Sequence, residues 1–189
     1  IGSLISVGID VSRRKLMESA LQNVALSITS VQGENVLREL ASYVCESLRV
    51  DFALIGSVRD GVVDTLAVCD RGVILDTFAY DLAGTPCEDV VGKQFSIHPD
   101  KLLHLYPRNE LLRRFGFRSY AGIPLFDSAG VAIGILAVLH RRPMRQPQFV
   151  ASLLKLYSVR AAAELERLRA DAALRGAEMG AEIVLKATK

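Results

Sequence analysis

The most regular hydrophobic pattern in the chain is a pair of apolar runs, 119–126 and 131–139, separated by four turn-forming residues. The first run is aromatic and branched, and the second is almost continuously apolar, as in a strand covered on both faces. Between them, Asp127-Ser128-Ala129-Gly130 begins with an Asx-type turn residue and ends with a glycine. The pattern predicts two antiparallel central strands with helices around them.

Shorter apolar segments ahead of this hairpin predict a core helix and three more strands. The helix is expected over 35–48, where apolar residues recur on one face, and the strands over 51–58, 62–69 and 73–80. An Asp-Gly pair between the first two strands predicts a tight hairpin turn.

The stretch from 81 to 117 loses this regularity. It predicts a short helix capped by Thr85, a short strand over 94–97, and two short helices over 101–106 and 109–115. Loops that a rigid sheet supports are common places for recognition residues.

Two longer helices are predicted near the chain ends, one over 13–31 and one from Gln146 or Pro147 to at least Arg175, with fraying expected beyond Gly176. Apolar residues in both recur at intervals of three and four, the spacing of a coiled-coil seam. We therefore expect the helices to pair in a parallel homodimer. The seam residues are Met17, Leu21, Val24, Ile28 and Val31, followed by Ala161, Leu165, Leu168 and Ala172.

The run Asp10-Val11-Ser12-Arg13-Arg14-Lys15 follows a short β-branched segment, 4–9, and precedes the first long helix. It resembles the exit motif of PAS domains, in which the acid and the hydroxyl residue cap the outgoing helix. The alternative is an ordinary strand-to-helix junction. On the PAS interpretation, residues 1–12 are the remnant of a PAS exit strand and residues 13–32 are a linker helix.

The central hairpin resembles the signature hairpin of GAF domains. The resemblance implies an α+β fold with a central antiparallel sheet of five or six strands, helices on one face and a lid of loops and short helices on the other. It implies a GAF domain over 33–160 and a coiled-coil-like connector over 161–189. The matching residues are Tyr120, Gly122, Ile123, Pro124, Leu125, Asp127, Gly130, Ile133, Gly134, Leu136, Ala137 and Val138.

In that family the lid forms one wall of a ligand cavity, so the resemblance implies a cavity here. In a sensor, the cavity side chains would surround an open space for the ligand. In a ligand-free dimerisation spacer, the same side chains would fill that space. Arg118 is our first choice to pair with an anion, although the basic cluster around it also fits solvated helix faces. The expected lining residues are Phe78, Tyr80, Cys87, Val90, Phe95, Leu102, Phe115, Arg118 and Tyr120.

Composition narrows the class of protein further. The 189 residues carry a formal net charge of +2, which argues against a dedicated nucleic-acid binder. Three widely spaced cysteines fit a reducing, cytoplasmic setting. No apolar run reaches the roughly 18 residues of a membrane span, so no membrane contact is expected. The chain begins with Ile1, and we expect it to be a piece of a longer polypeptide.

The search for catalytic sets finds no GxSxG, HExxH, P-loop or GxGxxG motif and no metal-ligand spacing among the histidines. His104 is the one histidine considered as a haem ligand. Methionine sulfoxide reductases related to GAF domains use converging cysteines, but only Cys87 falls near the expected cavity. Motifs for bilin attachment and cyclic-nucleotide binding are missing. The resemblance implies a non-catalytic sensory or relay module of a larger bacterial-type signalling protein. We expect it to bind an unidentified small molecule and to act through its terminal helices on an output domain such as a histidine kinase or diguanylate cyclase; no cofactor is assigned.

Overall fold

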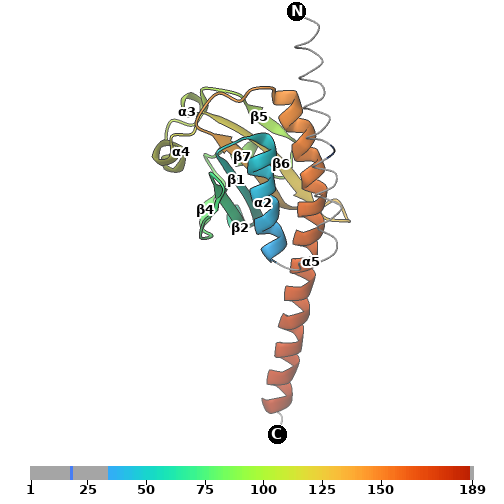
Figure 1. Cartoon of the computed structure of the whole chain (residues 1–189). Helices are drawn as coiled ribbons and strands as arrows, with labels where there is room; N and C mark the ends of the chain where they lie inside the picture. The colour runs from blue at the N-terminus through green and yellow to red at the C-terminus, as the bar shows by residue number, and fades with distance from the viewer. Residues whose placement is uncertain (1–17, 19–33, 188–189) are drawn as a thin grey trace, which may run out of the picture.

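A seven-stranded antiparallel sheet lies at the centre of residues 34–187 and separates two layers (Figure 1). The computed structural model describes residue 18 and residues 34–187, with side chains described for residue 18 and over 35–179. The predicted strand 4–9, its exit motif and all but one residue of the predicted helix 13–31 lie outside these residues. So do the seam residues Met17, Leu21, Val24, Ile28 and Val31.

The sheet has the strand order β3-β2-β1-β7-β6-β5, and β4 also pairs with β2. The two long hairpins, β1–β2 and β6–β7, meet where β1 pairs with β7. The strands are β1 (Phe52–Arg59), β2 (Val62–Asp70), β3 (Val73–Ile74), β4 (Ala79–Asp81), β5 (Ser96–His98), β6 (Ser119–Phe126) and β7 (Ala132–His140).

The predicted central hairpin is confirmed. β6 spans the predicted residues, β7 starts one residue later than predicted, and both are buried along almost their whole length. The turn is held by Asp127, whose carboxylate Oδ1 accepts hydrogen bonds from the backbone N–H of Ala129 at 3.0 Å and of Val131 at 2.8 Å. This Asx-type bonding fixes the strand register.

The α+β fold class is confirmed, but the strand predicted over 73–80 is broken into β3 and β4. At the break, the Thr65 hydroxyl on β2 accepts from the backbone N–H of Phe78 and donates to the Phe78 carbonyl, both at 2.7 Å. The Thr65 side chain thus replaces part of the backbone hydrogen bonding between the two strands, and residues 75–78 are not part of a strand. The sheet therefore has seven strands rather than five or six.

Two helices, α2 (Glu34–Leu48) and α5 (Pro147–Ala187), cover one face of the sheet (Figure 1). Their apolar faces and the inward side chains of the central strands form one hydrophobic cluster. The hydroxyls of Ser47 on α2 and Tyr157 on α5 lie 2.8 Å apart and tie the two helices together.

The predicted dimer seam on α5 is wrong for its first two residues. Ala161 and Leu165 are buried, with 0% and 1% of their surface exposed, and they belong to the core between α5 and the sheet. Leu168 is half-buried and Ala172 is exposed. Spacings of three and four mark any helix face that packs, and here the sheet is the partner. α5 also continues past Gly176, where fraying was expected, and ends at Ala187.

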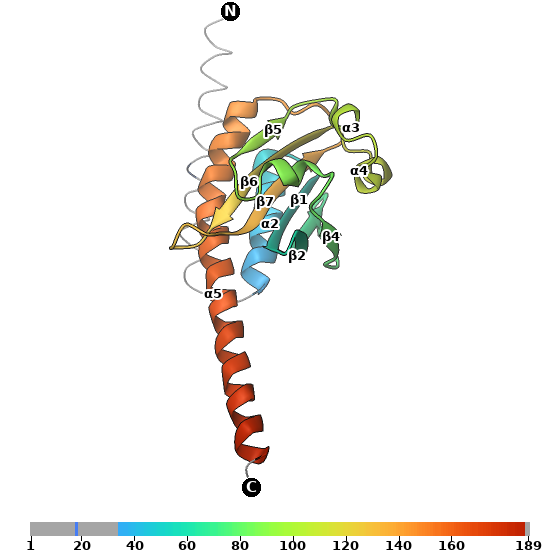
Figure 2. The ribbon, with the colours of Figure 1, turned by 180° about the vertical axis from the view of Figure 1, so that it is seen from behind.

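Short helices and loops cover the opposite face, as the lid prediction required (Figure 2). They are the 3-10 helix η1 (Pro86–Asp89), α3 (Leu102–Leu105) and α4 (Glu110–Phe115). Side chains alternate along the strands, so β1 sends Ala53 and Ile55 into the helix-side core and Phe52 and Leu54 into a second, lid-side core.

Candidate ligand-binding site

A small cavity lies between the lid and the sheet. Its volume is about 50 Å³, enough for a few water molecules. Pockets that hold drug-sized ligands are roughly 300–1,000 Å³. Five of the predicted residues line it: Phe78, Tyr80, Cys87, Phe115 and Tyr120.

The other four predicted residues lie elsewhere. Val90 and Leu102 are buried in the same lid-side core without lining the cavity. Phe95 packs on the helix side together with Ile97, because residues two apart on an extended chain share a face. His104, considered as a haem ligand, is on the exposed side of α3.

Arg118 does not contribute to the cavity either. Its guanidinium forms a two-pronged ion pair with Asp100, with Nη2 lying 2.9 Å from Oδ1 and 3.0 Å from Oδ2. The backbone N–H of Lys101 and this guanidinium hold the pKa of Asp100 below its ordinary value. Since Arg118 already has a carboxylate partner, it is not a free anion receptor.

Sequence reasoning placed only Phe115 of the three rings that form an aromatic wall at one end of the cavity, and it missed Phe52 and Phe117. The ring centroid of Phe52 lies 6.0 Å from that of Phe115 and 5.1 Å from that of Phe117, and all three rings line the cavity. Strict alternation along the first strand could have placed Phe52 on the lid side. The remaining wall and floor are formed by Leu54, Thr85, Pro86, Asn109, Leu111, Leu112 and Leu139.

Cys87 is the polar centre of the cavity, and two tyrosines from different strands donate to its sulfur. The Tyr80 hydroxyl from β4 lies 3.2 Å from Sγ, and the Tyr120 hydroxyl from β6 lies 3.4 Å away. Burial raises the pKa of the Cys87 thiol, although hydrogen bonds from Tyr120 and Tyr80 oppose the shift. Burial also raises the pKa of both tyrosines. All three groups are therefore neutral near pH 7.

The three cysteines do not converge. Cys45 and Cys69 belong to the helix-side core, across the sheet from Cys87. Burial raises the pKa of the Cys45 thiol, whose sulfur lies 3.7 Å from the Cys69 carbonyl oxygen. A thiol reductase needs a thiolate with a resolving partner in reach, and the described cysteines do not provide that pair around the cavity.

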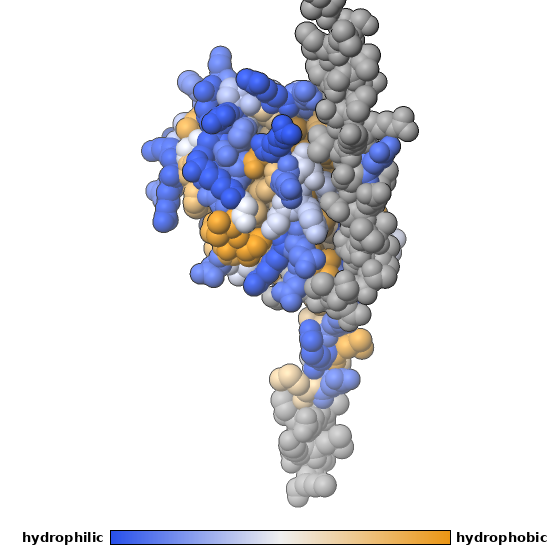
Figure 3. Space-filling model, in the orientation of Figure 1, coloured by the Kyte–Doolittle hydropathy of each residue, from blue (hydrophilic) through white to orange (hydrophobic). Residues whose placement is uncertain are grey.

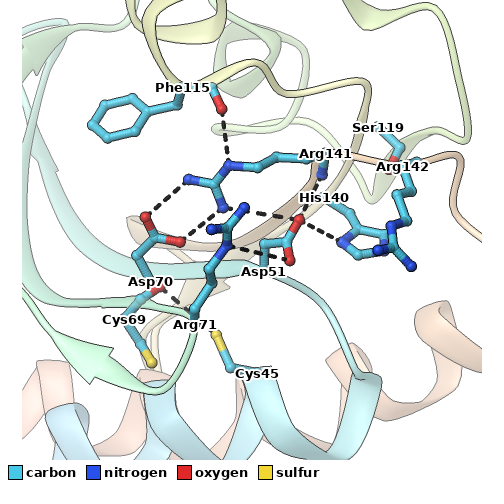
Figure 4. A network of polar contacts seen from close by, with 10 residues as sticks. All are labelled: Cys45, Asp51, Cys69, Asp70, Arg71, Phe115, Ser119, His140, Arg141 and Arg142. Carbon is cyan, nitrogen blue, oxygen red and sulfur yellow. Dashed lines mark hydrogen bonds and ion pairs between the residues drawn. The ribbon is translucent and has the colours of Figure 1, made fainter.

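A second polar cluster, centred on Arg141, joins the lid to the end of the sheet (Figure 4). The Arg141 guanidinium donates to both carboxylate oxygens of Asp70, at 2.8 and 2.9 Å, and its Nε donates to the Phe115 carbonyl at 2.9 Å. The guanidinium also lies 5.0 Å from the centroid of the Phe117 ring. We call this arrangement the Arg141 clasp. It holds the end of α4, whose Phe115 ring lines the cavity, to β2.

Asp51, the residue just before β1, completes the cluster. Its Oδ2 accepts from the backbone N–H of Arg141 and lies 2.8 Å from Nδ1 of His140. Partial burial would raise the pKa of Asp51, but the Arg141 backbone hydrogen bond and the His140 ring outweigh this and lower it. Arg141 was not among the residues singled out from the sequence.

Comparison with known families decides the identity of this fold. Residues 32–165 match the family described as the GAF domain. The chain belongs to the GAF domain family. The match reaches past residue 160, the predicted domain end, in agreement with the burial of Ala161 and Leu165.

One curated relative of this GAF domain is a hybrid signal transduction histidine kinase, named F, of Dictyostelium discoideum. The two are 22% identical over 156 residues, which is 81% of this chain. The match spans only 13% of the relative's length.

Solved structures share the fold at low sequence identity. The GAF domain of A. aeolicus nlh2, in an inactive state, has a TM-score of 0.62 and 10% identity, covering 84% of this chain and 99% of that one. The phycocyanobilin-bound GAF domain of a cyanobacterial phytochrome has a TM-score of 0.63 and 16% identity, covering 82% and 96%. A bacteriophytochrome from R. palustris has a TM-score of 0.64 and 14% identity, covering 86% and 39%.

The Tyr-x-Gly motif of the GAF hairpin has a steric explanation at this site. A Cβ atom built on Gly122 would lie 2.7 Å from Cζ of Tyr120, two residues earlier on the same face of β6. Because Gly122 has no side chain, the Tyr120 ring can lie over it, along the strand. In this position the Tyr120 hydroxyl reaches Cys87.

Hydrophilic side chains cover most of the described face seen in Figure 3. No group of three or more His, Cys, Asp or Glu side chains that could hold a metal ion occurs among the described residues. Across the part of the chain that the structure describes, no helix has the length and apolar character needed to cross a membrane.

Proposed function

We propose that this GAF domain is a sensory and relay module of a larger signalling protein, which binds a small ligand in the cavity and transmits the change through α5. The observation that carries the proposal is that one sheet connects both parts. β6 and β7 contribute Tyr120 and Leu139 to the cavity on one face, and the opposite face of β7 packs on α5.

The small cavity volume constrains how a ligand enters. With about 50 Å³ available, a molecule of more than a few heavy atoms needs a conformation in which α4 has moved away from the sheet. Such a ligand binds the open conformation more tightly than the closed one and so shifts the population towards it. Because Arg141 holds the Phe115 carbonyl, the movement of α4 acts directly on the clasp.

The same volume favours a smaller ligand than the one bound by the phytochrome relative. A bilin of the phycocyanobilin type is far larger than the cavity. The buried Cys87 sulfur also accepts hydrogen bonds from two tyrosine hydroxyls. The next residue is Glu88, whereas bilin-attaching cysteines are commonly followed by His. A small, mainly apolar molecule fits this lining better.

The output end of the proposal rests on the relatives and on α5. The histidine kinase relative supports an output domain of that class, and a diguanylate cyclase is the other candidate. A homodimer would pair the part of α5 beyond the core, where Met179 is 64% exposed, together with the sequence-predicted seam over 13–31. A PAS domain ahead of residue 13 and a cytoplasmic location complete the proposed arrangement.

A ligand-free dimerisation spacer is the second candidate. It is favoured by one observation, that the side chains expected to surround a ligand nearly fill the space themselves. The two candidates agree on the dimer and differ only in the cavity.

Native mass spectrometry and an absorption spectrum of the chain purified from cells separate them. A dimer with a reproducible extra mass or a chromophore band supports sensing. The matched variant is Leu112→Phe, which adds volume inside the cavity, with Leu105→Phe on the exposed side of α3 as its control. The extra mass should disappear in the first variant alone. A clean dimer without bound mass in every sample favours the spacer.

A further inference from the structure

The two tyrosine hydroxyls in the cavity are poorly matched to their shared acceptor. Tyr80 and Tyr120 both donate to the one sulfur of Cys87. A thiol sulfur is a weak hydrogen-bond acceptor, and buried tyrosine hydroxyls ordinarily find a full partner. The cavity therefore holds two strong donors whose hydrogen-bonding capacity is only partly used.

The donors are fixed in place by different parts of the fold. Tyr120 has no exposed surface and is positioned by the space over Gly122. Tyr80 comes from the three-residue strand β4, which pairs with β2 at the margin of the sheet. Cys87 lies on η1 in the lid. The two hydroxyls thus converge from the sheet on one point of the cavity, next to the sulfur.

The charge of the cavity restricts what an incoming group can be. Its described lining contains Phe, Leu, Tyr, Thr, Pro, Cys and Asn and none of the charged residue types. An ionised ligand would lose its hydration without meeting an opposite charge, which is strongly unfavourable. A neutral oxygen such as a ketone carbonyl would accept two hydrogen bonds without that cost.

We propose that the cavity recognises a neutral, mainly apolar molecule through one oxygen acceptor, which takes the Tyr80 and Tyr120 hydrogen bonds from Cys87. The proposal rests on the ligand-sensing function and names the ligand class for the same cavity. Because the sulfur is a weak acceptor, the exchange costs little. The aromatic wall of Phe52, Phe115 and Phe117 packs against the apolar part of the ligand.

Three probes of similar size test the acceptor requirement on the whole chain. Acetophenone has a neutral carbonyl, ethylbenzene has none, and benzoate carries a charge. Ligand-observed NMR titration should give acetophenone a dissociation constant about tenfold below that of ethylbenzene, with benzoate weaker than both.

Tyrosine variants assign the effect to the two hydroxyls. Tyr80→Phe and Tyr120→Phe should each weaken acetophenone binding about fivefold and leave ethylbenzene binding within about twofold. Tyr106→Phe is the matched control, because the Tyr106 hydroxyl donates to Asp89 and Tyr106 does not line the cavity. It should change neither titration.

A Cys87→Ala variant tests the same idea in the opposite direction. It keeps both phenols and removes their internal acceptor, so the preference for acetophenone over ethylbenzene should rise about threefold or more. This result does not depend on the stability of the tyrosine variants.

The outcomes distinguish this proposal from the function on which it rests. Equal binding of acetophenone and ethylbenzene would overturn the acceptor proposal and leave a ligand cavity in place. Tighter binding of benzoate would also overturn it. No binding of any probe, with no mass bound to the purified chain, would overturn both and favour the spacer.

Discussion

Leu165 of α5 packs directly on Gly134 of β7. A Cβ atom at position 134 would lie 2.5 Å from Cδ2 of Leu165, and it would also meet the backbone carbonyl oxygen of Gly56 on β1. The glycine of the hairpin motif therefore allows the Leu165 side chain of the C-terminal helix to lie directly on the sheet. Gly122 serves the opposite face in a similar way, because it makes room for Tyr120.

Gly134→Ala should destabilise the domain, because one of the two contacts is backbone and cannot move aside. We expect a loss of about 1–3 kcal/mol in the free energy of unfolding, the usual cost of overpacking. Urea unfolding measures it. Gly176→Ala on the exposed part of α5 is the matched control, since a Cβ there meets nothing within 4 Å. The control should be neutral or stabilised by up to about 1 kcal/mol, and equal losses in both variants would contradict the close contact.

Arg169 provides a polar attachment of α5 to the sheet. Its Nη2 donates to the Ser57 hydroxyl at 2.8 Å and to the carbonyls of Val58 and Ile133. Arg169→Met should lower stability by about 1–2 kcal/mol and speed hydrogen exchange of α5 amides near residue 169.

Arg167 is the control for that variant, because its ion pairs are with Glu164 and Asp171 of the same helix. Arg167→Met should leave exchange near the sheet unchanged. An identical exchange pattern in both variants would show that Arg169 does not anchor the helix.

The Arg141 clasp predicts a link between the sheet and the lid. Arg141→Met leaves Asp70 and the Phe115 carbonyl without their donor. We expect the free energy of unfolding to fall by about 1–3 kcal/mol, which is less than for a fully buried ion pair because Arg141 and Asp70 are partly exposed. Hydrogen exchange should rise in α4 more than in α2. The exposed neighbour Arg142 supplies the control as Arg142→Met. Protection of α4 equal to that of the wild type would argue against the clasp.

Asp51 makes the same region sensitive to acid. Its folded-state pKa lies below its ordinary value of 3.8, so its contribution is present above the unfolded pKa and is lost as pH falls through the folded pKa. The difference in stability between the wild type and Asp51→Asn should shrink as the pH falls below about 4. Urea unfolding across this range measures it. A difference that grows towards low pH would contradict the sign. His140, Arg141 and Arg71 all face the carboxylate.

Local pattern was enough to predict much of the fold. The apolar runs and the Asp127 turn give the central hairpin because their signals lie within about 20 residues of each other. The lid and five of the cavity residues followed from the resemblance. Phe95 was misplaced because its neighbours do not reveal which face of a short strand is turned to the lid.

Long-range partners could not be predicted in the same way. Arg141 meets Asp70 across 71 positions of the chain, and no local signal marks such a pair. The α5 seam was misassigned for a related reason. The apolar spacing along the helix predicts that Ala161 and Leu165 are buried, but it does not indicate whether another helix or a sheet covers them.

The uninterrupted length of α5 has a mechanical consequence. From Leu165 to Ala187 it extends 22 residues beyond its last fully buried contact, which is about 33 Å at 1.5 Å per residue. It can therefore act as a lever that pivots on the sheet, where Leu165 packs on Gly134 and Arg169 donates to β1 and β7. A tilt of about 5° at that point displaces the far end by about 3 Å, so a side-chain-sized rearrangement at the sheet becomes a shift of more than half the helical pitch at the other end of α5.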